Sequence, residues 1–575
     1  MNQKKNVTGY PSLDKPWLDK YPAYMFGDRK KYSSIYERLY ENWGYDDETI
    51  INYYDTSITS KEFFDKVDCI AKSLYTIGVK EGDSIAVSLE SVPEFLELFL
   101  ACELLGCSIK NFMESIENNI ELIQGCSSDI YITQDYITKG DVEKIYECTG
   151  IKHIILIDPL FSATNRNGIR ENIYCAIQER YIDERSFNEK NIEWKDFIQM
   201  GINVENLPSI KNDNVLFSAF TSGTSGKAKE VLHSSETLLG VIGQLALSPS
   251  HEKGKDTWLL TILPPTLVAV VAAMMFYPLV DGKQLILDPF CRVEDLDLEM
   301  MHYEPNCWAL IPMFFNSLIE SKRIPDNYDM SYFKLFGFGA EPMTNKFISK
   351  VQKFLDEHNC KAPFSSGYGQ SEGGSGFTVC IDREMMAAGS AGMPYIDTVI
   401  SIFKPGTDEE LRYNEVGEIC KAGPGLMIGY ADEDKTEETL KKHKDGKVWL
   451  HTGDYGFMTQ EGLLFVLGRK PINISPDKMV WPLLLENKVL LCSGIKDAVI
   501  VSGRDSENVD YEVPFLFVVL EDKQDESKVI DKLKVYIENT FMPEEKPKAI
   551  YVIDKKPMSH FKTDRRFLQE EYKLL

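Results

Sequence analysis

The chain has 575 residues, with 89 acidic side chains against 63 basic ones and a formal net charge of −26 at pH 7. A chain of this length exceeds what one hydrophobic core supports, so we expect several domains or subdomains. The hydrophobic fraction of 43% excludes a disordered chain. The acidic balance argues against general nucleic-acid binding, because a phosphate backbone attracts lysine and arginine.

The cysteines and the amino-terminal residues both indicate a reducing compartment. Twelve cysteines are scattered along the chain without a Cys-x-x-Cys pair, so we expect reduced, buried thiols rather than disulfides or a metal cluster. Lys4 and Lys5 are not followed by an apolar segment, which is unlike a secretory signal. We therefore predict a cytoplasmic protein.

Strand-like apolar runs alternate with helical patterns along the chain. Ile85–Leu89 is followed by the helical pattern Glu94–Leu105, and Trp308–Ile311 is followed by Phe314–Ser321. This alternation predicts an α/β architecture.

A loop rich in glycine and hydroxyl side chains follows the strand-like run Val215–Phe220. Thr221–Lys229 reads Thr-Ser-Gly-Thr-Ser-Gly-Lys-Ala-Lys. The glycines allow a sharp turn close to a ligand, and the hydroxyl and backbone N–H groups can donate to phosphate oxygens. A Walker A loop is excluded, since Ala228 stands where that motif has Ser or Thr. From this segment alone, a flexible linker is as good an interpretation as a phosphate loop.

The uncharged segment Trp258–Val280 has nearly the length of a membrane span. Pro264-Pro265 and Pro278 interrupt it, so we predict a buried strand over Trp258–Leu263, a turn, and a core helix near Leu267–Phe276. We expect no membrane span.

The strongest domain boundary lies at Gly468-Arg469. It follows a predicted hairpin, Gly453–Phe457 with Leu463–Leu467, turned by residues 460–462. A smaller α+β pattern comes after it, with strands at Ala498–Val501 and Phe515–Leu520 and a helix at Ser527–Asn539. Between residues 546 and 566, seven basic side chains stand against two acidic ones, which indicates either a solvated face or a patch for an anionic ligand.

Six segments stand out in order along the chain: Thr221–Lys229, Gly337–Pro342, Tyr368–Glu372, Gly417–Tyr430, His451–Gly456 with Gly468-Arg469, and Pro557–Arg566. In this order they resemble the motifs of the AMP-forming adenylating superfamily of acyl-CoA synthetases, peptide-synthetase adenylation domains and luciferases. Each motif alone is weak, but the resemblance in order covers nearly the whole chain. The nearest likeness is to a stand-alone acyl- or aryl-acid ligase.

The resemblance implies a fold and a reaction. It implies a large multi-subdomain α/β domain over residues 1–468 and a small, mobile α+β domain over residues 469–575. Such enzymes join a carboxylic acid to ATP, forming an acyl-adenylate and pyrophosphate, and most pass the acyl group to a thiol. ATP, Mg²⁺ and either CoA or the phosphopantetheine of an acyl or peptidyl carrier protein are therefore expected, with a small carboxylic acid as substrate.

The resemblance also gives each motif residue an expected role. Glu372 and Thr224 are expected to hold Mg²⁺, because that ion prefers hard oxygen ligands. Asp454 is expected to accept the ribose hydroxyls, and Tyr368 to stack on adenine. The residues expected to bind ATP or AMP are Thr221, Ser222, Gly223, Thr224, Ser225, Gly226, Lys229, Gly339, Ala340, Glu341, Tyr368, Gly369, Gln370, Ser371, Asp454 and Arg469.

Lys562 is the expected catalytic residue, together with Glu372. An ammonium group can bridge two anions, the substrate carboxylate and the α-phosphate, and favour their approach. The alternative is an ordinary surface lysine. The local match is imperfect, because the family usually has glycine where this chain has Phe561.

The acyl pocket is expected around His233, Leu267, Val268, Val271 and Gly367. Peptide-synthetase domains place an aspartate near this helix to pair the α-ammonium, and none occurs between Thr261 and Val280. The substrate is therefore expected to be a neutral, apolar aliphatic or aryl acid. The same residues also fit an ordinary core, and His233 also fits a polar residue at a helix start.

The hinge departs from the family pattern, since Pro471 and Pro476-Asp477 replace less restricted residues. Proline fixes its own φ and restricts the preceding residue, so we expect a narrower domain swing or one displaced to Gly468-Arg469, and a slower or more selective thiol step. The alternative to an enzyme is a nucleotide-binding scaffold or sensor of the same fold that does not catalyse a reaction.

Overall fold

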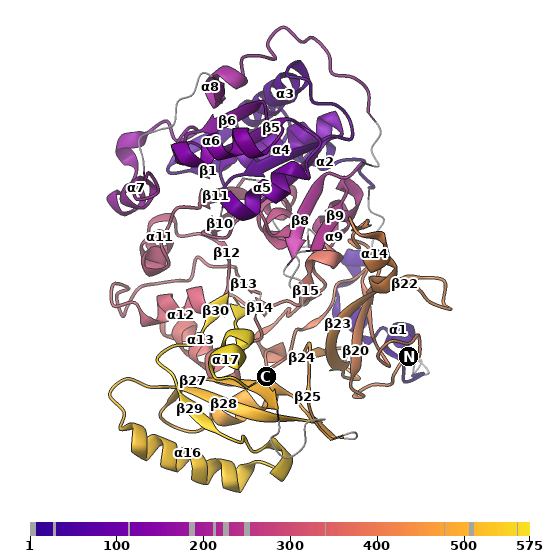
Figure 1. Cartoon of the computed structure of the whole chain (residues 1–575), viewed down its shortest axis with the longest axis vertical. Helices are drawn as coiled ribbons and strands as arrows, with labels where there is room; N and C mark the ends of the chain where they lie inside the picture. Colours follow the sequence, from indigo (N-terminus) through magenta and orange to yellow (C-terminus); the bar gives the residue numbers. More distant parts are fainter. Residues whose placement is uncertain are drawn as a thin grey trace.

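The computed structural model describes residues 7–26, 30–112, 116–182, 190–210, 214–221, 229–245, 254–339, 341–475, 478–504, 511–559 and 562–574. In Figure 1 the two large sheets form the upper and middle part of the molecule, the smaller sheet lies to one side, and the carboxyl-terminal unit lies at the lower end. This arrangement confirms the predicted α/β class with a large and a small domain.

The first large sheet has eight strands in the order β21-β9-β8-β4-β3-β5-β6-β7. Its centre is parallel, while β8, β9 and β21 pair antiparallel at one end. The strands are β3 (Ser84–Ser88), β4 (Ser108–Asn111), β5 (Ile130–Gln134), β6 (His153–Ile157), β7 (Asn191–Glu193), β8 (Phe217–Thr221), β9 (Lys229–His233) and β21 (Gly429–Tyr430).

The second large sheet has seven strands in the order β14-β13-β12-β10-β11-β1-β2. It is parallel except for the β1–β2 pair. The strands are β1 (Thr49–Tyr53), β2 (Thr56–Thr59), β10 (Thr257–Thr261), β11 (Gln284–Asp288), β12 (Cys307–Leu310), β13 (Leu335–Phe338) and β14 (Phe364–Ser366).

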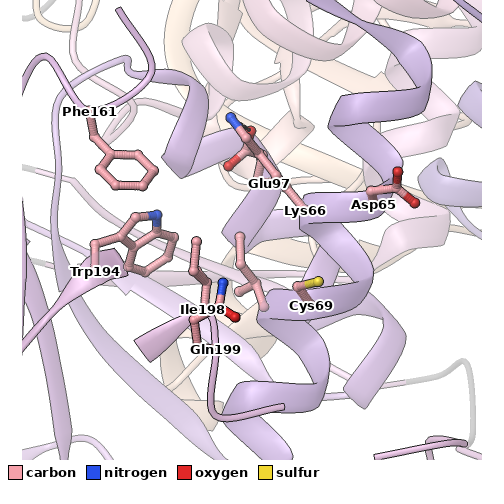
Figure 2. A pocket seen from close by; sticks show the side chains of 9 residues that line it. Asp65, Lys66, Cys69, Glu97, Phe161, Trp194, Ile198 and Gln199 are labelled. Atoms are coloured by element: carbon pink, nitrogen blue, oxygen red, sulfur yellow. Dashed lines mark ion pairs between the residues drawn. The ribbon is translucent and has the colours of Figure 1, made fainter. Parts of the chain in front are cut away.

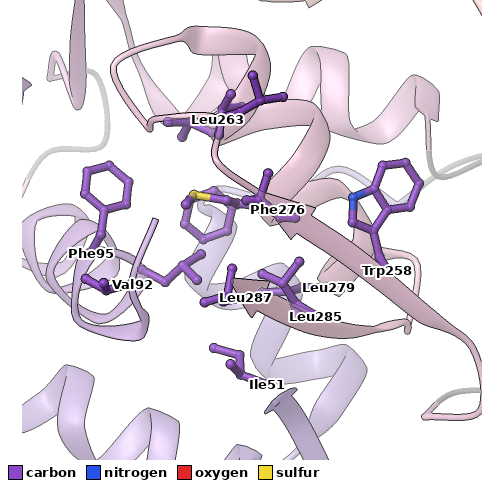
Figure 3. Close-up of a cluster of buried hydrophobic side chains, with 14 of the residues drawn as sticks. Ile51, Val92, Phe95, Trp258, Leu263, Phe276, Leu279, Leu285 and Leu287 are labelled. Carbon is purple, nitrogen blue, oxygen red and sulfur yellow. The ribbon is translucent and has the colours of Figure 1, made fainter. Parts of the chain in front are cut away.

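The main core includes residues of both large sheets and of helix α4 (Pro93–Leu105). Apolar side chains surround this helix, which also contains Glu94, Glu97 and Glu103, and all of its residues except Leu104 are buried, as expected for a helix between two layers. Figure 3 shows part of this core, where Phe95 and Val92 face Phe276 and Leu287. β3 and α4 fall within a residue or two of their predicted positions.

Further helices pack around these two sheets, except that α1 and α14 contact strands of the third sheet described below. They are α1 (Pro11–Asp14), α2 (Ile35–Trp43), α3 (Ser60–Thr76), α5 (Ile116–Gln124), α6 (Lys139–Cys148), α7 (Glu171–Gln178), α8 (Trp194–Phe197), α9 (Ser235–Leu245), α11 (Leu296–Tyr303), α12 (Pro312–Glu320), α13 (Asn345–Glu357) and α14 (Glu433–Thr439).

The apolar segment expected as strand, turn and helix is β10 followed by a π-helix, η4 (Val270–Phe276), which continues into α10 (Tyr277–Val280). The turn is strained at Ile262, whose φ of 57° is rare for a β-branched residue. No helix among the described residues has the length and apolarity to span a bilayer.

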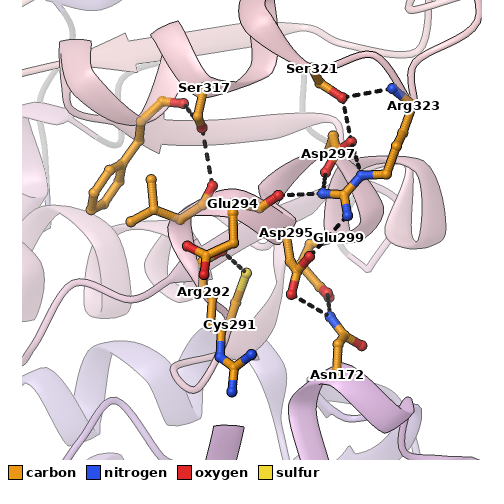
Figure 4. A network of polar contacts seen from close by, with 12 residues as sticks. Asn172, Cys291, Arg292, Glu294, Asp295, Asp297, Glu299, Ser317, Ser321 and Arg323 are labelled. Carbon is orange, nitrogen blue, oxygen red and sulfur yellow. Dashed lines mark hydrogen bonds and ion pairs between the residues drawn. The ribbon is translucent and has the colours of Figure 1, made fainter. Parts of the chain in front are cut away.

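A polar network joins α11 and α12 to α7 (Figure 4). Arg323 donates from Nε to Asp297 at 2.8 Å and from a terminal nitrogen to Asp295 at 3.1 Å. Asn172 of α7 donates to Asp295 at 3.3 Å. These bonds give buried carboxylates the partners they need, so the network is structural.

The third sheet contains β19 (Val399–Phe403), β20 (Gly417–Ala422), β22 (Leu440–Lys442), β23 (Val448–Met458) and β24 (Leu464–Gly468). Its own core includes Trp449 and Trp17 from the amino-terminal segment. The predicted hairpin is the β23–β24 pair, although β23 begins earlier because it also pairs with β22.

The carboxyl-terminal unit packs α15, α16 and α17 around a three-stranded sheet with its own core. Its elements are β25 (Ile472–Ser475), β26 (Lys478–Val480), α15 (Pro482–Val489), β27 (Ile495–Arg504), β28 (Glu512–Leu520), α16 (Glu526–Thr540), β29 (Ile550–Val552), β30 (Met558–Ser559), β31 (Lys562–Thr563) and α17 (Arg565–Glu571). β24 ends at Gly468, whose φ of 118° favours glycine. The boundary at residues 468–469 and the mobility of this unit stay predictions.

The cysteines are unpaired, and eight of the twelve are buried, whereas Cys69, Cys148 and Cys175 are exposed. Burial raises the pKa of most of the buried thiols, which fits packed side chains rather than nucleophiles.

Candidate active site

The predicted phosphate loop connects two antiparallel strands. Thr221 ends β8 and Lys229 begins β9, and these two residues are cross-strand partners. The Lys229 ammonium lies 4.9 Å from the centre of the Tyr430 ring on neighbouring β21. The intervening residues Ser222, Gly223, Thr224, Ser225 and Gly226 lie outside the described part of the chain, so their roles remain predictions.

Asp454 on β23 is the centre of a polar cluster formed by four of the predicted residues. Its Oδ2 accepts hydrogen bonds from the Tyr368 hydroxyl at 2.7 Å and from Gln370 Nε2 at 2.6 Å. Its Oδ1 accepts from Arg469 Nε at 3.1 Å. Burial and the adjacent carboxylate raise the pKa of Tyr368 well above its ordinary value, so its hydroxyl stays a donor.

Glu372 lies in a short 3₁₀ turn, η6 (Ser371–Gly373), beside this cluster. Its Oε1 accepts a hydrogen bond from the Tyr430 hydroxyl at 2.7 Å, and its backbone carbonyl accepts from Met427 N at 2.9 Å. Burial and this carboxylate raise the pKa of Tyr430. Among the described residues only Tyr430 bonds the Glu372 carboxylate.

Lys421 also supports the η6 turn, and no motif of the sequence indicates this role. Its ammonium donates to the carbonyls of Gly373 at 3.1 Å and Pro424 at 2.6 Å, and it lies 5.0 Å from the Phe377 ring centre. The side chain is buried, and burial lowers the pKa of Lys421 to about 7. A lysine inside the apolar run Ile419–Ala422 was the available signal.

His233 also supports the turn. Its Nε2 faces the carbonyl oxygen of Ser371 at 2.8 Å and its Nδ1 faces Thr237 Oγ1 at 3.0 Å. Burial lowers the pKa of His233 to about 4, so the ring is neutral at physiological pH. Both nitrogens have protein partners, which favours a structural role over the predicted substrate contact.

The other predicted acyl-pocket residues are not brought together around a described cavity. Val268 and Val271 are fully buried in the main core, whereas Leu267 is 39% exposed. Gly367 follows β14, where an added Cβ would lie 3.0 Å from the Thr378 carbonyl oxygen. The pocket assignment remains a prediction.

Lys562 is exposed on the two-stranded hairpin β30–β31 of the small domain. The next residue, Thr563, donates from its backbone N and its hydroxyl to Glu341 Oε1 at 2.7 and 2.8 Å. Lys556 lies 3.7 Å from the other Glu341 oxygen. Glu341 therefore binds the small domain, in addition to any contact with a nucleotide; Gly339 precedes it, and Ala340 lies outside the described residues.

Most of the basic residues between 546 and 566 have acidic partners. Lys546 pairs with Glu538, Lys556 with Asp497, Arg565 with Glu486 and Arg566 with Glu570. Their charges are largely compensated, which weakens the interpretation of this segment as a patch for an anionic partner.

Glu418, Cys420 and His451 form a buried group behind Asp454. His451 Nδ1 lies 3.0 Å from Glu418 Oε2 and 3.5 Å from Cys420 Sγ, and its Nε2 lies 2.9 Å from His443 Nε2. Glu418 Oε1 also accepts from Gly453 N at 3.1 Å. These side chains bond one another, and the Glu418–Gly453 bond holds β23 directly before Asp454.

A cavity of about 110 Å³ lies away from this site, between α3 and the segment that includes α8 (Figure 2). Phe161, Trp194 and Ile198 form apolar walls, and the Lys66–Glu97 ion pair lies at its edge. It belongs to the packing of the first sheet rather than to the predicted active site.

Comparison with known proteins supports the sequence resemblance. A 4-coumarate–CoA ligase of Vanilla planifolia is 27% identical over 90% of this chain and 88% of its own length. A long-chain-fatty-acid–CoA ligase of Salmonella typhimurium is 24% identical over 97% of this chain and 98% of its own.

Two solved structures have the same fold. The anthranilate CoA ligase AuaEII with anthranoyl-AMP aligns with a TM-score of 0.78 at 14% identity, covering 96% of this chain and 98% of that one. The o-succinylbenzoate CoA synthetase of Bacillus subtilis with ATP and magnesium aligns with a TM-score of 0.68 at 21% identity, covering 90% and 96%. The family model for AMP-binding enzymes matches residues 40–431, more than half of the chain, and the protein therefore belongs to the AMP-binding enzyme family.

Proposed function

We propose that the protein is an ATP-dependent carboxylic acid ligase that forms an acyl-adenylate and pyrophosphate and then transfers the acyl group to a thiol. The observation that carries this proposal is the cluster of Tyr368, Gln370 and Arg469 around Asp454, with Glu372 in the adjacent turn. In a member of the AMP-binding enzyme family, these observations support Asp454 as the proposed ribose acceptor and Glu372 as the proposed cation ligand.

The reaction brings two anions together, so its barrier is electrostatic. In the proposed mechanism, the carboxylate of the acid attacks the α-phosphorus of ATP, and the bond from that phosphorus to the pyrophosphate oxygen breaks. Lys562 offsets the charge of the two approaching anions, and Lys229 with residues 221–226 holds the departing phosphates. Asp454 fixes the ribose.

The Glu372 carboxylate suits a magnesium ion, because Mg²⁺ prefers hard oxygen ligands. Glu372 and Thr224 would hold the ion, which would supply charge neutralisation at the phosphates. Lys421 and His233 keep the Glu372 turn in place through the carbonyls of Gly373 and Ser371.

For the substrate, we propose a neutral, apolar aliphatic or aryl acid. The segment from Thr261 to Val280 has no acidic side chain that could pair an α-ammonium group. The two sequence relatives reported above are named as ligases of 4-coumarate and of long-chain fatty acids, an aryl and an aliphatic acid.

For the acceptor, we propose CoA, because the relatives reported above are all named as CoA ligases or synthetases. A carrier-protein phosphopantetheine is the second candidate. Both contain the same thiol arm, and separate assays with CoA and with a loaded carrier protein distinguish them. We also propose a cytoplasmic location, from the composition.

The test is pyrophosphate release from ATP and Mg²⁺ with a panel of fatty, cinnamic and benzoic acids, followed by addition of CoA. We expect release with at least one acid and formation of its CoA thioester. If no acid supports release while ATP still binds, the protein is a nucleotide-binding scaffold instead.

A further inference from the structure

One short segment of the large domain contacts both the predicted nucleotide site and the small domain. Residues 341–346, which we name the docking segment, follow β13 and lead into α13. Gly339, two residues before it, belongs to the motif expected beside adenine. Within the segment, Glu341, Asn345 and Lys346 each bond the small domain.

Glu341 makes the contact closest to the chemistry. Both of its oxygens face the small domain: Oε1 accepts two hydrogen bonds from Thr563, and Oε2 lies 3.7 Å from Lys556. Hydrogen bonds to an ionised acceptor are stronger than those between neutral groups. Because Thr563 directly follows Lys562 on a two-residue strand, these bonds fix the backbone that carries the expected catalytic ammonium.

The other end of the segment holds the body of the small domain. Lys346 donates to the Ile495 carbonyl at 2.7 Å and to Glu521 at 2.8 Å. Asn345 N donates to Asn487 Oδ1 at 3.0 Å. These contacts reach α15, the start of β27 and the residue after β28, so the segment touches the small domain at two separate places.

We propose that the docking segment locks the small domain in the pose that forms the adenylate, with Glu341 as the positioning residue for Lys562, and that nucleotide binding beside Gly339 strengthens the lock. This inference rests on the proposed function for its catalytic part. The resemblance implies that the small domain swings from an adenylate-forming pose to a thiol-transfer pose, and in that case these contacts oppose the second half-reaction.

Two conservative variants test the lock. Thr563→Val removes one hydrogen-bond donor and keeps a β-branched side chain on the strand, and Lys346→Met removes the second contact. Each has a matched control. Thr540→Val changes a threonine of the same domain that bonds Tyr536 O, and Lys350→Met changes a lysine one turn later on α13 that bonds Asn316 and Glu320 of the large domain.

Single-turnover assays separate the two half-reactions. We expect Thr563→Val to slow adenylate formation about tenfold and Lys346→Met about threefold, because each loses a bond to a charged group. Acyl transfer to CoA from separately supplied acyl-adenylate should be unchanged or faster in both. Equal losses in both half-reactions, or no loss of adenylate formation, would overturn the lock.

Deuterium exchange gives a readout that needs no turnover. In the unmodified protein, ATP should slow exchange in the peptide containing Met558–Thr563, and Thr563→Val should speed it several-fold while both controls leave it unchanged. Exchange that responds neither to ATP nor to Thr563→Val contradicts the proposal. If no acid is turned over by the unmodified protein, the proposed function fails, and exchange alone then decides whether the segment docks the small domain.

Discussion

The nucleotide side and the acyl side of the predicted site differ in how they are built. Around Asp454 and Glu372, polar groups from separate strands bond one another at 2.6 to 3.1 Å. Around Val268 and Val271, the side chains are buried among the apolar residues of the main core. Hydrogen-bonding side chains indicate a site through the partners they bond. Apolar side chains pack in the same way in a substrate pocket and in a hydrophobic core.

The largest effect should come from the nucleotide side. Lys562→Ala should reduce adenylate formation on the order of a hundredfold or more, since it removes the charge that offsets two approaching anions. ATP affinity should change little, because Asp454 and Glu372 are intact. Single-turnover pyrophosphate release and an ATP binding isotherm measure the two quantities. Adenylate formation at the unmodified rate would show that this lysine has no such role.

Asp454→Asn should weaken ATP binding about thirtyfold, because it removes the charged acceptor that we assign to the ribose. Asp445→Asn is the matched control, as that aspartate lies before the same strand and bonds Lys447 and Trp449. Calorimetric titration with ATP compares the two variants. Equal ATP affinity in the two variants would mean that Asp454 does not bind the ribose.

On the acyl side, we expect a smaller effect, which is a preference between two kinds of acid substrate. A free α-amino acid should be turned over at least about tenfold less efficiently than its deaminated analogue, because burying an unpaired ammonium costs several kcal/mol. The comparison is kcat/KM for pyrophosphate release with matched pairs such as phenylalanine and 3-phenylpropionate. A preference for the amino acid would mean that a carboxylate outside the Thr261–Val280 segment lines the pocket.

The last of these predictions concerns stability rather than rate. Lys421 has a folded pKa of about 7, below its unfolded value near 10.5, so the unfolded chain binds more protons between these values. The contribution of Lys421 to stability therefore rises with pH above 7, by about 2 kcal/mol up to pH 9. Relative to Lys421→Met, the unmodified protein should gain thermal stability over this range, as measured by calorimetry at pH 7, 8 and 9. A constant difference between the two proteins would mean that Lys421 stays charged.

The sequence predicts much of this fold because local patterns determine its elements. β3 and α4 were predictable from an apolar run followed by a helix start at Pro93. The π-helix was not, since the apolar spacing of residues 267–276 fits an ordinary helix. The early start of β23 depends on its partner β22.

The candidate site divides in the same way. The order of the motifs along the chain predicts a shared nucleotide site for Asp454, Tyr368, Gln370 and Arg469, and these four side chains do form one cluster. The Glu341–Thr563 contact joins residues 222 positions apart, and no local pattern indicates it. The role of Lys421 depends on backbone carbonyls, which have no sequence signature.

The Asp454 carboxylate already accepts three hydrogen bonds from the protein, so a ribose that binds there shares the carboxylate with these donors or displaces one of them. When a nucleotide lacks a hydroxyl, Tyr368 and Gln370 can keep their bonds, and no buried charge is left without a donor. A site of this kind rejects an analogue strongly only when the missing group leaves a polar partner unpaired. Discrimination between ATP and 2′-deoxy-ATP should therefore be mild, and much of the enthalpy of ribose binding should cancel.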